Sequence, residues 1–409
     1  MNAPPLRLPG EHFAAALGFL LVGAVALIRT APMLAAGSYP AATVVGTTHL
    51  FTLGWLTTSI MGALYQFLPV ALGQPIASER AAHVTFGLHV TGVALLVGGM
   101  YGGHSTMLLT GAAMIGVAIT IFLVNLGTTL RRAEHRDITW WAICAAAIFL
   151  GITFVLGTAL GINLRTGFLG DLRQLALGTH LHVALFGWVL LVIVGVSHRL
   201  LPMFLLSHGG RTHFAHYAVA LLAMGAGMLA VFHHVPIAGR ELPALCLAAG
   251  VIAYLRQARE FYRRRHRPAL DPGLHLAAGA LGMLAVALPL GALVVTGLAS
   301  LHLRVAYVLV VVLACTLFVA AHYYKIVPFL IWNTRFGPLA GTRKLPRVGD
   351  LYGQRIANVA VTCLALGGTL LAASAGFGSL AGVRIGAALF ATGVVVEASQ
   401  MTAIARRQP

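Results

Sequence analysis

Residues 49–69 read HLFTLGWLTTSIMGALYQFLP, and residues 182–202 read HVALFGWVLLVIVGVSHRLLP. Counted from the histidine, both stretches have Gly at +5, Trp at +6, Gly at +13 and Pro at +20. A third stretch, residues 308–328, also ends in proline but begins with Val308 instead of histidine. Five matching positions over 21 residues indicate an internal repeat.

The composition places this repeat in a membrane. Of the 409 residues, 59% are apolar and only 9% are charged, which is too little charge to cover the surface of a soluble protein of this size. The 47 glycines favour close packing of membrane helices. The sequence therefore predicts an all-α, polytopic membrane protein.

Twelve apolar segments are each about long enough to span a bilayer as a helix. The repeat-bearing segments, near 42–72, 174–203 and 301–331, are four apart in this series. We therefore expect a single membrane domain, residues 1–409, with twelve helices in three pseudo-symmetric four-helix arcs whose repeat-bearing helices face the centre. The segments are 13–34, 42–72, 81–101, 105–130, 139–162, 174–203, 213–235, 242–262, 274–297, 301–331, 352–375 and 380–402.

The net charge of +17 is explained by membrane orientation. If both ends of the chain lie on one side, 21 of the 27 Lys and Arg residues fall on that side and six on the other. This is the positive-inside pattern, so both termini are expected in the cytoplasm of a bacterial-type inner (plasma) membrane, without a nucleic-acid partner. The first segment is too long for a cleaved signal peptide and is expected to be retained.

Several common types of site are missing from the sequence. The four cysteines occur singly, and no GxGxxG, P-loop, HExxH or CxxCH motif is found. Among the acidic residues only Glu397 falls within a span, so the membrane interior contains too few carboxylates to form a proton relay. A polar cluster in the inner half, formed by His198, Tyr65, Tyr324 and His322, is expected to serve packing, with a proton path as the alternative.

Histidine is in surplus, with 18 residues against 10 Asp and Glu. Imidazole is costly in hydrocarbon unless it has a partner, and the neutral ring is a common ligand of copper, iron and zinc. About half of the histidines lie at helix ends, where capping or headgroup contact explains them. The others form a band in the outer third of the membrane: His49, His104, His180, His182, His233, His234 and His302.

The histidine pattern resembles the catalytic subunit of the heme-copper oxidases. The resemblance rests on twelve helices, on His182 with Gly at +13 and Pro at +20, and on a His-His pair that closes the seventh helix. It is nearest to the C-type oxidases, the nitric oxide reductases and the NnrS-like membrane proteins. It implies copper at His182, His233 and His234, and a low-spin, b-type heme at His49. It also implies heme propionates paired with arginines such as Arg240 and Arg304.

The tenth helix departs from that pattern. The oxidases carry a His-x-His pair there, whereas Ala306 and Val308 occupy these positions, counted from Pro328. Either His302 substitutes as a heme ligand through a local shift, or one or both hemes are missing. A third interpretation is that His180 and His182, which lie on opposite helix faces, serve two groups.

Two classes of function remain open. The first is a redox protein that uses heme and copper to bind or reduce a small gas, O2 or NO, with an electron donor (cytochrome c or quinol) or an accessory subunit as partner. The second is a non-enzymatic copper- or heme-binding or transport protein on the same fold. The residues do not decide whether the protein is an oxidoreductase, and no catalytic residue is assigned.

Overall fold

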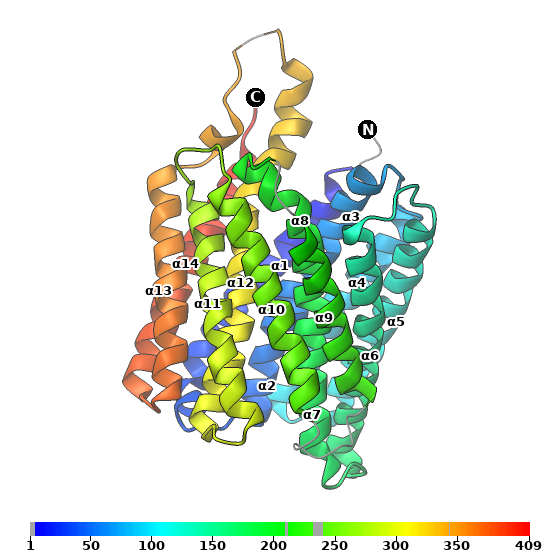
Figure 1. The fold of residues 1–409 in the computed structure, drawn as a ribbon, viewed down its shortest axis with the longest axis vertical. Helices are drawn as coiled ribbons and strands as arrows, with labels where there is room; N and C mark the ends of the chain where they lie inside the picture. Colours follow the sequence, from blue (N-terminus) through cyan, green and yellow to red (C-terminus); the bar gives the residue numbers. More distant parts are fainter. Residues whose placement is uncertain (1–4, 209–211, 232–239, 343) are drawn as a thin grey trace. The chain divides into compact units, whose positions relative to one another are not determined.

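The computed structural model describes residues 5–208, 212–231, 240–342 and 344–409 (Figure 1). The described residues are helical almost throughout and contain no β-strand. The α-helices are α1 (Arg7–Ala35), α2 (Ala42–His49), α3 (Thr58–Leu72), α4 (Glu79–Gly102), α5 (Ser105–Arg131), α6 (Ile138–Thr166), α7 (Leu172–His182), α8 (Leu191–Leu205), α9 (His213–Val231), α10 (Glu241–Arg263), α11 (Pro272–Val295), α12 (Leu301–Ile331), α13 (Gln354–Gly376) and α14 (Leu380–Arg406). The π-helices are η1 (Leu50–Thr57), η2 (Val183–Leu190) and η4 (Trp332–Phe336), and the short 3₁₀ turns are η5 (Gly337–Leu339) and η6 (Val348–Leu351).

The helices confirm the prediction of an all-helical, multi-pass membrane protein. Eleven continuous helices within the described residues are long and apolar enough to cross a membrane. The remaining expected span corresponds to α10, which has 23 residues. Its second half carries Arg256, Arg259 and Glu260, so its composition is less apolar than that of the other eleven.

The three repeat-bearing helices are the most buried spans. The share of buried residues in the most apolar part of each span is 72% for Ala42–Leu72, 72% for Leu172–Leu205 and 78% for Leu301–Leu339. The other eight spans have 28–50%. A helix surrounded by other helices buries its whole circumference, whereas a lipid-facing helix buries one side. The prediction that these three helices are the interior ones agrees with this burial.

Polar side chains and glycines set the ends of the spans. Ser78, Asp137, Ser300 and Ser379 each accept a hydrogen bond from a backbone N–H in the first turn of α4, α6, α12 and α14. Such caps satisfy donors that would otherwise lack a partner at a helix start. Three helices end at a glycine with positive φ, a conformation that side chains disfavour: Gly73 after α3, Gly103 after α4 and Gly167 after α6.

The chain divides into two compact units. The first comprises residues 1–15, 52–267 and 291–298, and in it α6 packs against η2, α8 and α9 while α9 also packs against α10. The second comprises residues 16–51, 268–290 and 299–409, and in it α12, α13 and α14 pack against one another. Glycines permit the closest helix pairs, because a methyl group at Gly111 of α5 or at Gly367 of α13 would collide with backbone of the neighbouring helix.

Position +13 of the repeat lies at a close helix contact in each of the three repeat-bearing helices, although in α12 the glycine belongs to the neighbouring helix. A methyl group at Gly62 would lie 2.5 Å from His12 Cβ of α1, and one at Gly195 would lie 2.6 Å from Ala142 Cβ of α6. In α12, position +13 is Ala321, and its carbonyl oxygen would lie 2.6 Å from a methyl group at Gly273 of α11. Each interior helix therefore meets the long helix that precedes it at a glycine.

Candidate metal and heme ligands

Both histidines that begin the repeat are followed by eight residues of π-helix. His49 ends α2 and η1 follows, and His182 ends α7 and η2 follows. In α12 the corresponding residues, 309–316, are regular α-helix. π-Helical turns are rare and are often found at functional sites. The histidine and the π-helix therefore occur together in two interior helices and are both missing from the third.

Side chains from other helices bond to η1. The indole Nε1–H of Trp188 in η2 donates to Thr57 Oγ1, at 3.1 Å. The imidazole Nε2–H of His89 in α4 donates to the carbonyl oxygen of Leu53, at 3.1 Å. A change from α- to π-geometry alters which carbonyls are paired within the helix, so donors from neighbouring helices stabilise it. His89 was not among the predicted site residues, because its only signal in the sequence is an imidazole in the middle of an apolar span.

His49 and His182 are held in the same tautomer. Nδ1 of His49 lies 2.8 Å from the carbonyl oxygen of Val45, and Nδ1 of His182 lies 2.7 Å from that of Gly178. Because a carbonyl oxygen only accepts, each Nδ1 carries the proton, and in the neutral ring the lone pair is on Nε2. Metal-bound histidines usually place their other nitrogen on such an acceptor. Both rings therefore have the form that a metal ion or heme iron needs.

Arg240 lies beside His182. Its Nη1 would be 3.6 Å from a methyl group at Gly178, whose carbonyl accepts the hydrogen bond from His182. The positive charge acts on the His182 ring, and Phe186 stacks on that ring at 5.9 Å between centroids. Partial burial lowers the pKa of Arg240, but a guanidinium remains charged at neutral pH. The imidazole of His182 therefore has a guanidinium cation beside it, and this cation could pair with an acidic group of a bound molecule.

His233 and His234, the other two predicted copper ligands, lie outside the described residues. The helix that precedes them, α9, packs against α7 and η2, which meet at His182. Arg240 follows His234 by six residues. Among the described residues, no three His, Cys, Asp or Glu side chains come together to hold a metal ion.

His180 is directed onto α6. Its Nδ1 lies 3.1 Å from the carbonyl oxygen of Thr153, and a methyl group at Gly157 would lie 2.8 Å from its Cε1. His182 instead bonds to its own helix. The two histidines therefore have different surroundings, as their predicted positions on opposite faces of the helix require. His104, which belonged to the predicted outer band, is exposed at the start of α5.

His302 and Arg304 lie in the first turn of α12. The ring of His302 approaches the turn between α13 and α14, because a methyl group at Gly378 would lie 3.1 Å from its Nε2. Nε of Arg304 is buried and has no hydrogen-bond partner among the described residues. The first turns of α12 are regular α-helix. No irregularity of the helix therefore brings His302 to position 306 or 308.

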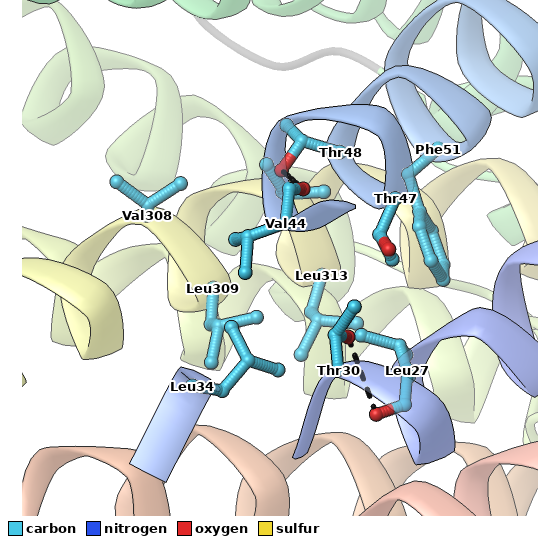
Figure 2. A pocket seen from close by; sticks show the side chains of 11 residues that line it. Leu27, Thr30, Leu34, Val44, Thr47, Thr48, Phe51, Val308, Leu309 and Leu313 are labelled. Carbon is cyan, nitrogen blue, oxygen red and sulfur yellow. Dashed lines mark hydrogen bonds between the residues drawn. The ribbon is translucent and has the colours of Figure 1, made fainter. Parts of the chain in front are cut away.

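An apolar cavity lies next to Val308. It lies between α1, α2, η1 and α12, is partly open, and is lined only by residues of the second unit (Figure 2). Three threonines border it, and each hydroxyl donates to a carbonyl of its own helix: Thr30 to Ala26, Thr47 to Thr43 and Thr48 to Val44. The cavity wall is therefore apolar at the point where the third repeat histidine is replaced by valine.

Comparison with known proteins gives no family. No family model matches the chain, and no curated protein matches it. The site must therefore be interpreted from its own residues.

Proposed function

We propose that this chain is a membrane heme- and copper-binding redox protein related to the catalytic subunit of the heme-copper oxidases. It would bind or reduce a small gas, O2 or NO, and so act as an oxidoreductase of a respiratory chain. A single observation carries the proposal. The two repeat histidines, His49 and His182, both have Nδ1 bonded to a helix carbonyl, and both directly precede an eight-residue π-helix.

His182 would hold copper together with His233 and His234. Imidazole is a suitable ligand of copper, and His182 has its lone pair on Nε2. The packing of α9 against α7 and η2, together with the place of Arg240 beside Gly178, supports this set.

His49 would hold a heme, with His302 as a second candidate ligand. Arg304, whose Nε lacks a partner among the described residues, and Arg240 would pair with propionates. A bound heme and copper would supply electron transfer and a place for the gas to bind. The protein residues fix the imidazole tautomer, provide positive charge and exclude water. The apolar cavity beside Val308 suits a small uncharged gas better than a charged substrate.

The proposed membrane arrangement consists of three four-helix arcs, with both termini in the cytoplasm of a bacterial-type plasma membrane. The equivalent contacts at position +13, which involve Gly62, Gly195 and Ala321, support the threefold repeat. The uneven distribution of Lys and Arg supports the orientation. Cytochrome c or a quinol would supply electrons, directly or through an accessory subunit.

The second candidate function is non-enzymatic binding or transport of copper or heme on the same fold. One observation favours it. Residues 306 and 308 of α12 are not histidines, and residues 309–316 form a regular α-helix instead of a π-helix. Without these ligands fewer metal groups can be held, and a full oxidase cycle requires several.

The two functions are distinguished by the metal content of the purified full-length protein. We would record the reduced-minus-oxidised optical spectrum and count iron and copper per chain. The redox proposal expects at least one heme and one copper with reversible reduction, and it expects CO or NO to shift the spectrum. Copper without a Soret band would support the non-enzymatic alternative. A protein with neither metal would refute both.

Single variants test the assignment of each ligand. His49→Ala should abolish the heme signal and His182→Ala should abolish the copper, each by more than tenfold. His322→Ala is a matched control, because His322 forms the same bond from Nδ1 to a carbonyl, that of Phe318, at 2.7 Å, but in a regular α-helix. The assignment fails if His322→Ala loses as much metal as the other two variants, or if His182→Ala keeps its copper.

A further inference from the structure

A second site is formed by polar side chains in the second unit. Glu397 of α14 has an exposed fraction of 0%, and neither of its carboxyl oxygens has a hydrogen-bond partner among the described residues. Tyr324 Oη and Gln400 Oε1 are also buried and have no hydrogen-bond partner among the described residues. Tyr352 completes the group, with its ring 5.4 Å from that of Tyr324. We call these four residues the Glu397 cluster.

The members of the cluster lie close together. Tyr324 and Glu397 come from α12 and α14, which pack against each other, and the two side chains are near enough to interact electrostatically. Gln400 is three residues beyond Glu397 and therefore on the same face of α14. Its Nε2 donates to the carbonyl oxygen of Gly353, at 3.2 Å, immediately after Tyr352. The four side chains thus extend from the interior of α14 to the turn before α13.

Among the described residues, no cation is paired with the carboxyl group. Lys325 is next to Tyr324 in the chain, but it is paired with Asp271. Arg304 of α12 is half-buried but precedes Tyr324 by 20 residues, about 30 Å along the helix, whereas Arg355 of α13 and Arg384 and Arg406 of α14 are exposed. The nearest imidazole on α12, that of His322, is bonded through Nδ1 to the carbonyl of Phe318, and Cys363 of α13 is half-buried. An isolated carboxylate without a partner is strongly disfavoured in a membrane interior, and binding of a proton is the usual way to neutralise it.

We propose that the Glu397 cluster is a proton-binding site within the membrane, loaded from the side at which α14 ends. Glu397 carries the proton, the amide oxygen of Gln400 can accept a hydrogen bond from the protonated carboxyl group, and the hydroxyl group of Tyr324 can both accept and donate one. Glu397 is nine residues before the end of α14 at Arg406, which corresponds to about 14 Å along the helix. Gln400 and Tyr352 lie between Glu397 and that end. This site does not depend on the proposed metals.

Infrared spectroscopy of the full-length protein tests the proposal. The protonated carboxyl group of Glu397 should give a C=O stretching band at neutral pH that shifts on transfer from H2O to D2O and disappears in Glu397→Gln. The matched control is Glu260→Gln, because Glu260 is ion-paired with Arg264 at the charged end of α10 and should contribute no such band. Tyr324→Phe removes only the hydroxyl group and should change the band position without abolishing it.

Each other outcome would overturn the proposal. A carboxylate signal at neutral pH that depends on Na+ would identify a cation site instead. A protonated band that does not exchange with D2O would identify a sealed structural residue. If Glu397→Gln does not fold, the exchange of the band in the unmodified protein and its displacement in Tyr324→Phe still decide the question.

Discussion

The hydrogen bond between Trp188 and Thr57 links the two π-helices that follow the repeat histidines. Its length is 3.1 Å, and both residues have an exposed fraction of 2%. Water therefore cannot easily replace either partner. If this bond helps to hold η1 and η2 in their π-geometry, the stability losses caused by removing the two partners should not be additive.

The expected coupling energy follows from the type of bond. Hydrogen bonds between membrane helices average about 0.6 kcal/mol in double-mutant cycles and reach about 1.7 kcal/mol. Complete burial places this bond in the upper half of that range, so we expect about 1 kcal/mol of coupling between Trp188→Phe and Thr57→Val. Thr57→Val alone removes the acceptor with little change in volume and should cost about 1 kcal/mol. Trp188→Phe should cost more, since it also leaves a cavity.

The assay is the free energy of unfolding in mixed detergent micelles for both single variants and the double variant. A matched control pairs Thr57→Val with Trp140→Phe, because the indole of Trp140 donates to the carbonyl of Leu130 instead, at 2.9 Å. The control pair should be additive within about 0.5 kcal/mol. Equal additivity for Trp188→Phe and Thr57→Val would refute the link between the π-helices.

Two further predictions concern the stability of the fold. Burial raises the pKa of Asp137, but hydrogen bonds from Arg199 and from backbone N–H groups outweigh it, so the net pKa lies below the usual value. Ionised Asp137 should therefore stabilise the folded protein at any pH above the pKa that Asp137 has in the unfolded chain. This stabilisation should be lost as the pH falls through the lower pKa that Asp137 has in the folded chain. Melting curves recorded between neutral and acidic pH would measure the loss. Asp137→Ala should cost about 1 kcal/mol, and Asp137→Asn less, because Asn keeps the helix cap. Gly111→Ala should lower the free energy of unfolding by about 1–3 kcal/mol, because the added methyl group would collide with the backbone of Leu96. Gly127→Ala is the control, because the space around Gly127 is open, and it should leave the melting temperature unchanged or raise it.

The spans could be predicted from the sequence because bilayer thickness limits their length. The expected segments 105–130 and 380–402 correspond to α5 and α14 within a few residues at each end. The interior position of the three repeat-bearing helices also followed from the repeat and agrees with their burial. The apolar character of α10 was overestimated, because hydropathy averaged over its length hides the charges of its second half.

The π-helices could not be predicted, because hydrophobic periodicity does not distinguish a wide helical turn from a regular one in a fully buried helix. A signal was present in the residues, however. Gly54-Trp55 and Gly187-Trp188 lie within η1 and η2, whereas α12 has Leu313 and Ala314 at these positions and remains regular. The copper assignment stays a prediction, since two of its three ligands lie outside the described residues.

The differences in α12 bear on how many groups the protein can hold. If a single ligand had been lost by random substitution, the surrounding helix would still have the features that accompany the ligand in the other two repeats. Instead the histidine, the Gly-Trp pair and the π-helix are all missing from α12, and apolar side chains line the cavity at Val308. We therefore infer that α12 is adapted to the absence of a ligand at position 308, so that His49 and His182 are the two repeat positions available for the proposed groups.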